Sequence, residues 1–73
     1  MTQRGYMENL ADDLTKEIAR VRKVLQHYKN IGAAEMLGTK LLEQDLIEAD
    51  EAAMSGDVVR MLKIYNILKK IVS

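Results

Sequence analysis

An apolar residue recurs every seven positions through the first third of the chain, and this repeat limits the possible folds more than any other feature. The repeat consists of Met7, Leu14, Val21 and Tyr28. Further apolar residues flank it at helical spacing, namely Leu10, Ala11, Ile18, Val24, Leu25 and Ile31. A broad apolar stripe of this period is typical of an amphipathic helix. We therefore predict a helix over residues 6–30, ended by Gly32, because glycine readily takes the left-handed conformation that closes helices.

Two more helices are predicted, over residues 34–54 and 58–72, joined by Ser55-Gly56-Asp57. Gly56 suits the end of the second helix, and Asp57 can cap the amide groups that open the third. Because the link is so short, the two helices should form an antiparallel hairpin. The apolar stripe expected in the second helix consists of Gly38, Leu41, Leu42, Leu46, Ala49, Ala52 and Ala53.

The length and composition of the chain restrict what can stabilise this fold. Its 73 residues make a single domain, 1–73, and it has no cysteine for disulfides or thiolate metal sites. With a single histidine, His27, a zinc site would need carboxylates for most of its ligands, and such sites are uncommon. We therefore expect neither a metal nor a cofactor. Small scaffolds without such supports rely on regular helix packing or on oligomerisation.

The third helix is the most apolar segment, and its apolar positions cover well over half of its circumference. In a three-helix monomer each helix keeps an outer face, so we expect a second chain to cover that of helix three. The predicted all-α fold is thus completed by a homo-oligomer, with a dimer favoured. The residues predicted for self-association are Met61, Ile64, Tyr65, Ile67, Leu68 and Ile71, with Ile64 and Ile67 taken to point outward.

Charge is separated by helix although the formal net charge is zero. Residues 1–30 carry a net charge of +2, residues 31–57 carry −6, and residues 58–73 carry +4. This alternation favours a bundle in which the acidic second helix meets two basic ones. The zero net charge argues against a dedicated nucleic-acid binder, whose affinity comes largely from neutralising phosphates. No segment has the apolar length of a membrane span or a secretory signal, so we expect a cytoplasmic protein.

Several polar residues are candidates for a partner surface: Arg20, Lys23, His27, Asp45 and Glu48. Asp45 shares a face with Leu41 and Leu42, so it is either an acid that meets a cation across an interface or an edge carboxylate that reaches solvent, Lys69 or Lys70. The basic residues near the end of the first helix are either a solvated face or an anion or partner site. His27 is expected at the surface. Met36, Ile47 and Met54 are either isolated exposed residues or a second contact surface.

From Glu17 onward, about two thirds of the chain resembles small helical proteins encoded in prophages and other mobile elements of proteobacteria. A histidine-tyrosine-lysine motif followed by an isoleucine-glycine turn and a helical hairpin carry the resemblance. The matching residues are His27, Tyr28, Lys29, Ile31, Gly32, Glu43, Gln44, Glu48, Ala49, Asp50, Ser55, Gly56, Asp57, Val58, Val59, Met61, Tyr65 and Leu68. The resemblance brings no catalytic residues. It implies a mobile-element accessory protein, and such proteins often bind a host or phage protein.

The sequence therefore predicts a protein without enzymatic activity that self-associates and binds an unidentified protein partner, as a regulator or inhibitor. Two alternatives remain open. One is a small nucleic-acid-linked regulator that uses the basic faces of the first and third helices across a dimer. The other is a small helical enzyme whose site lies between subunits and includes Arg20, Asp45 and Glu48.

Overall fold

Three helices make up the computed structural model, which describes residues 3–72, with side chains described from Leu10 onward. They are α1 (Gln3–Asn30), α2 (Leu37–Ser55) and α3 (Val58–Lys69). The described residues contain no strand, which confirms the predicted all-α fold with a long first helix and a helical hairpin. Met7, the first residue of the seven-residue repeat, lies outside the residues whose side chains are described.

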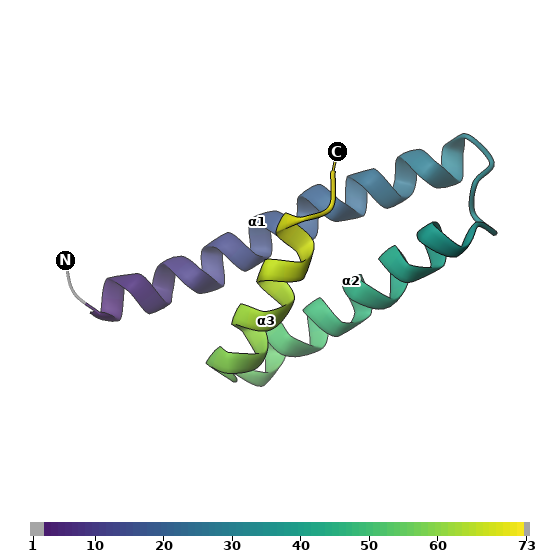
Figure 1. The fold of residues 1–73 in the computed structure, drawn as a ribbon. Helices are drawn as coiled ribbons and strands as arrows, with labels where there is room; N and C mark the ends of the chain where they lie inside the picture. The colour runs from purple at the N-terminus through teal and green to yellow at the C-terminus, as the bar shows by residue number, and fades with distance from the viewer. Residues whose placement is uncertain (1–2, 73) are drawn as a thin grey trace.

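The helices form an open arrangement in which α3 crosses the other two (Figure 1). Helix α2 runs back alongside the C-terminal half of α1. Helix α3 then turns away from the end of α2 and reaches the middle of α1, where the chain ends. The molecule is elongated, with principal extents of 45 × 19 × 17 Å, because α1 alone has 28 residues.

The connection between α1 and α2 begins with a glycine-based helix stop. The Gly32 φ angle is +81°, the Gly32 amide donates to the Lys29 carbonyl, and the Ala33 amide donates to the Tyr28 carbonyl. This pair of bonds is the Schellman motif, so the predicted stop at Gly32 is confirmed. The connection then continues to Met36, and α2 begins at Leu37, three residues later than predicted.

The turn between α2 and α3 has the predicted capping residues. Gly56 adopts the left-handed conformation with φ +73°, and the Asp57 side chain accepts hydrogen bonds from the Val59 and Arg60 amides. This side-chain cap sets the start of α3 at Val58. At the other end α3 stops at Lys69, three residues before the predicted end at residue 72.

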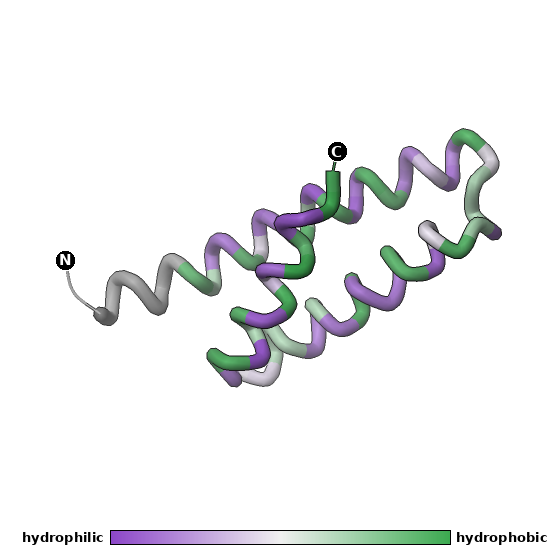
Figure 2. The backbone as a smooth tube through the Cα atoms, viewed as in Figure 1, coloured by the Kyte–Doolittle hydropathy of each residue, from purple (hydrophilic) through white to green (hydrophobic). Residues whose placement is uncertain are grey.

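The core lies where the three helices meet. Its residues are Leu14, Ile18, Val21, Leu25, Leu42, Leu46, Ala49, Ala52, Met61, Ile64 and Leu68. Figure 2 shows apolar and polar segments alternating along the helices, with apolar stretches also at the α1–α2 connection and at the chain end. These last stretches belong to the candidate site described below.

The charge separation seen in the sequence produces ion pairs between helices. Lys29 on α1 lies 3.2 Å from Glu43 on α2, and Arg22 on α1 lies 2.7 Å from Asp50. Arg60 on α3 bonds Glu48 at 3.1 Å and Glu51 at 3.2 Å. The acidic α2 therefore meets basic residues of both neighbours, as expected. Exposed pairs of this kind contribute only about 0–1 kcal/mol each, so they orient the helices more than they stabilise them.

Candidate functional site

The third helix, which we expected to need cover from another chain, is largely covered by its own. Met61, Ile64 and Leu68 are buried in the core, and Tyr65 and Ile71 are partly buried against it. Ile67 is the member of the predicted self-association set that is exposed. The prediction that Ile64 points outward is wrong: Ile64 is 3% exposed, because α3 lies across both α1 and α2 and so packs on two sides.

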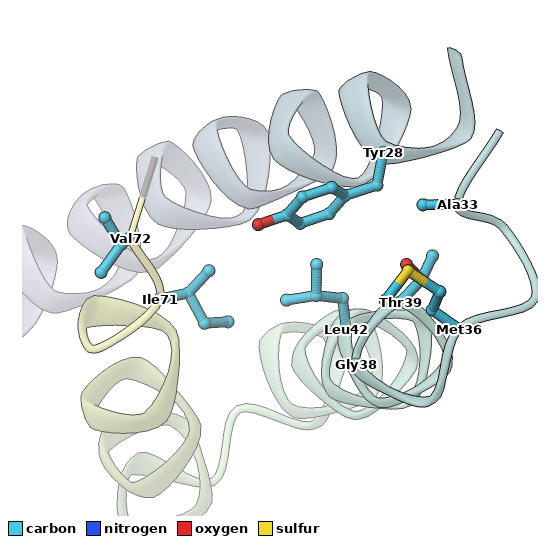
Figure 3. Close-up of a pocket in the computed structure, with 8 residues that line it drawn as sticks. All are labelled: Tyr28, Ala33, Met36, Gly38, Thr39, Leu42, Ile71 and Val72. Carbon is cyan, nitrogen blue, oxygen red and sulfur yellow. The ribbon is translucent and has the colours of Figure 1, made fainter. Parts of the chain in front are cut away.

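An apolar pocket lies instead at the other end of the molecule, between the C-terminal half of α1, the start of α2 and the chain end. Its volume is about 350 Å³. The lining residues are Tyr28, Ala33, Met36, Gly38, Thr39, Leu42, Ile71 and Val72. Figure 3 shows the Tyr28 ring above Leu42, with Ile71 entering from the segment that follows α3 and Ala33 and Met36 at the side of the connection. The pocket thus brings together residues from α1, the α1–α2 connection, α2 and the segment that follows α3.

Two of the residues that line this pocket are exposed apolar side chains, and three more exposed apolar residues lie within two positions of a lining residue in the sequence. Met36 and Val72 line it and are also exposed to solvent. Leu37 and Leu41, on either side of Gly38 along α2, are 75% and 56% exposed. We define the apolar rim as Ile31, Met36, Leu37, Leu41 and Val72, all of which are exposed large hydrophobic residues. Isolated exposed apolar residues are ordinary, but several around one apolar pocket are typical of an interaction site.

The second-helix stripe predicted from sequence is correct for four of its seven residues. Leu42, Leu46, Ala49 and Ala52 are buried as expected. Gly38, Leu41 and Ala53 are exposed, and Thr39 is buried in the part of α2 that faces α1. Because α3 does not extend along the start of α2, the Gly38 and Leu41 side of α2 has no neighbour there. The sequence pattern alone did not reveal this difference between the two ends of α2.

Arg20 is used within the chain. Its guanidinium donates to the Leu68 carbonyl at 2.8 Å and to the Ile71 carbonyl at 2.9 Å, and it pairs with Glu17 at 2.8 Å. It therefore caps the last turn of α3, where carbonyl groups lack helical partners and the helix dipole favours a cation. This contact ties the middle of α1 to the end of α3. Sequence spacing contained no signal for it, because the partners are backbone atoms about 50 residues away.

The other predicted partner-surface residues on α1 lie at the surface. Lys23 and His27 are exposed, as expected for His27, and Lys23 forms no ion pair with a described residue. The His27 and Tyr28 ring centroids are 6.1 Å apart. These two residues remain available to a partner.

The two predicted acidic residues of α2 have different surroundings. The Glu48 carboxylate accepts a hydrogen bond from Arg60. This hydrogen bond and the negative charge of Glu48 raise the pKa of Arg60. Asp45 is half-buried and forms no ion pair or hydrogen bond with a described residue, so the predicted pairing with Lys69 or Lys70 does not occur. Burial raises the pKa of the Asp45 carboxyl, because desolvation disfavours its charged form.

A second, shallower groove lies on the outer side of α1 and α2. It includes Leu25, Leu46 and Ile47, and the Arg22–Asp50 and Lys29–Glu43 pairs lie at its edge. Met36 lines the first pocket and Met54 lies at the far end of α2, so Met36, Ile47 and Met54 do not form one surface.

Among the described residues no three His, Cys, Asp or Glu side chains are placed to hold a metal ion. No helix of the described chain is long and apolar enough to cross a membrane. Comparison with protein families, with characterised proteins and with solved structures gives no match to this chain. The functional argument therefore rests on the pocket and its rim.

Proposed function

We propose that this chain is a cytoplasmic, non-enzymatic protein that forms a homodimer through the apolar rim and binds a protein partner. The observation that supports the proposal is the apolar rim itself, five exposed hydrophobic residues around one apolar pocket. A standard protein interface takes about 800 Å² from each partner, or about 15% of this chain's accessible surface of 5276 Å².

This proposal moves the predicted interface from the outer face of α3 to the start of α2. Met61, Ile64 and Leu68 are buried within the single chain, so they stabilise the core of the monomer and do not form the dimer interface. The half-buried Asp45 lies four residues after Leu41, so the two side chains are neighbours on one face of α2. An apolar centre with Asp45 at its edge fits the predicted interface.

The protein partner follows from the resemblance to mobile-element proteins, together with the exposed Lys23 and His27. Nucleic acid is the weaker alternative, because Arg22, Lys29 and Arg60 are paired with acidic residues of α2. An enzyme site built from Arg20, Asp45 and Glu48 is weaker still. Arg20 caps α3 and Glu48 binds Arg60, so both would have to break existing bonds to act on a substrate.

Size-exclusion chromatography with light scattering tests the dimer. The wild-type chain at micromolar concentration should have twice the 8.3 kDa chain mass. The double variant Leu37→Glu/Leu41→Glu should have the single-chain mass. Leu37 lies in the first turn of α2, where a carboxylate interacts favourably with the helix dipole. Leu37→Glu therefore does not weaken the helix.

The expected size of the effect follows from burial. Covering a leucine is worth about 1.5–3 kcal/mol, and scaling by the exposed fractions of Leu37 and Leu41 gives about 1–2 kcal/mol each. A twofold interface contains each residue twice, so either single variant should raise the dimer dissociation constant roughly 30- to 700-fold.

The matched control is Met54→Glu. Met54 is also an exposed apolar residue of α2, but it lies 17 residues after Leu37, which is about 26 Å along the helix. Its substitution should leave the dimer intact. A wild-type chain that stays monomeric at 100-fold higher concentration, or a Met54→Glu variant that dissociates as readily as the rim variants, would refute the proposed dimer.

A further inference from the structure

One hydroxyl that lines the apolar pocket has no hydrogen-bond partner within the described protein. Thr39 is 3% exposed, and its hydroxyl forms no hydrogen bond with a described residue. No fully enclosed side-chain nitrogen or oxygen lacks a partner among the described residues, so this hydroxyl keeps access to the pocket that Thr39 lines. Water can bond the hydroxyl there, and a ligand that displaces this water loses affinity unless it bonds the hydroxyl in its place. A hydroxyl in this position favours a ligand that bonds it.

A second hydroxyl faces the same space. Figure 3 shows the Tyr28 ring lying over Leu42 with its hydroxyl directed toward Ile71, into the middle of the pocket. The remaining lining is apolar, and Gly38 contributes only backbone. A side chain added at Gly38 would meet no heavy atom within 4 Å, so the wall of the pocket is open at that point. The pocket therefore offers a mostly apolar surface with two hydroxyl groups on it.

The charge and size of the pocket narrow the class of ligand. No charged residue lines it, and the nearby Lys29 ammonium is paired with Glu43 at 3.2 Å. The volume of about 350 Å³ lies at the lower end of the range of about 300–1,000 Å³ that is usual for small-molecule sites. A charged ligand would lose its hydration in the pocket without gaining a counter-ion, which is costly. A small neutral ligand avoids this cost because it has no charge to desolvate.

We infer that this pocket is a binding site for a small uncharged amphiphile, with an apolar ring or chain against Leu42 and Ile71 and a hydroxyl or amide group bonded to Thr39. The pocket lies within a single chain, so its lining does not require a second copy. The ligand enters from the open side that the apolar rim surrounds, and Met36 and Val72 contact its exposed end.

The test uses 4-ethylphenol as the probe and ethylbenzene, which lacks the hydroxyl, as its matched control. Titration into methyl-labelled protein, followed by NMR, should shift the signals of Met36, Leu42, Ile71 and Val72 in a saturable way. Ligands of this size reach dissociation constants on the order of 1 mM or below. Shifts that do not saturate, or that extend equally to the distant Met54, would mean non-specific contact with apolar surface and would overturn the inference.

Two variants test the contacts. Thr39→Val keeps the side-chain shape and should weaken 4-ethylphenol about 3- to 10-fold, the effect of one neutral hydrogen bond, while ethylbenzene binds as before. Gly38→Leu should abolish binding of both probes by filling the open wall, and leucine is also the better helix former, so the fold should persist. Ala53→Leu adds the same side chain at an exposed position away from the pocket and should bind both probes normally. Equal effects of Thr39→Val on the two probes, or full binding by Gly38→Leu, would overturn the inference.

The remaining comparison separates the ligand from a second copy of the chain. The Leu37→Glu/Leu41→Glu variant and the wild type should bind 4-ethylphenol within about threefold of each other. If only the rim variant binds the probe, the pocket of the wild-type chain is filled by a side chain of a second copy, and the small-molecule inference is wrong although the proposed dimer stands. If the wild type is monomeric and binds the probe, the proposed dimer fails and the inference stands.

Discussion

Replacement of Arg20 by methionine tests the contact between the middle of α1 and the end of α3. The substitution keeps the apolar stem but removes the guanidinium, which donates to the Leu68 and Ile71 carbonyls at 2.8 and 2.9 Å. Hydrogen bonds from charged donors are worth about 1.5–3 kcal/mol each when buried. The Arg20 side chain is 31% exposed, and water can reach the carbonyls once it is gone, so about 1 kcal/mol each is the better value. We therefore expect Arg20→Met to cost about 2 kcal/mol.

Thermal unfolding followed by circular dichroism measures this cost. For a domain of this size, about 2 kcal/mol corresponds to a fall in the melting temperature of roughly 8–16 °C. The matched control is Arg22→Met, two residues away on the same helix. Its pair with Asp50 is short, at 2.7 Å, but both side chains are at least half exposed, so its loss should cost 0–1 kcal/mol.

Amide hydrogen exchange adds a readout of where the damage occurs. In Arg20→Met the last turn of α3 should lose protection before the rest of the bundle, because its carbonyls have lost their cap. If Arg20→Met and Arg22→Met lower the melting temperature equally, Arg20 is only another surface cation and the capping argument is wrong.

Two further predictions concern α2 and α3. Asp45→Asn should be more stable than the wild type at pH 7, because the folded wild type then holds a carboxylate whose charge burial disfavours. The difference should shrink as the pH falls through the raised pKa of Asp45 and disappear below the ordinary value of 3.8, where the folded and the unfolded chain both bind the proton. Melting temperatures at pH 7 and pH 3 check this, and an Asn variant less stable at pH 7 would contradict it. Leu68→Ala removes a core side chain that is 0% exposed, so it should lower the free energy of unfolding by about 2–5 kcal/mol at any protein concentration. Leu62, on the same helix, is 41% exposed, so Leu62→Ala should lower it by less than about 1 kcal/mol. Urea unfolding measures both values, and equal losses would place Leu68 outside the core.

The features that sequence predicts well here are local ones. Gly32 ends α1 and Gly56 with Asp57 joins α2 to α3, because a left-handed glycine and an aspartate cap act on backbone atoms within a few residues. The broad stripe of α1 also packs as expected from Leu14 to Leu25. The pairing of Lys29 with Glu43 follows from the charge separation, although the partners were not predictable one by one.

The features that sequence missed depend on how far each helix extends. The cap that Arg20 forms on α3 requires knowing where α3 ends in space, and the seventy-three residues contain no short-range signal for that. Thr39 was not among the residues expected in the α2 stripe, and it is buried at 3% exposure. The α1–α2 connection is also longer than expected, because no side chain caps the start of α2 at Met36.

The difference in length between α2 and α3 explains where the apolar surface lies. At 1.5 Å per residue, the 19 residues of α2 span about 28 Å and the 12 residues of α3 about 18 Å. Near the turn, α3 covers the side of α2 that carries Glu48 and Ala52, and Ala52 is fully buried. The same side carries Gly38 and Leu41 about 15–20 Å further on, beyond the reach of a helix that also crosses at an angle (Figure 1).

The apolar character of α3 is therefore used mainly inside the monomer, where Met61, Ile64 and Leu68 are buried. Helix α3 is apolar because it packs against two neighbours. The start of α2 is left uncovered because α3 runs from the end of α2 toward the middle of α1 (Figure 1).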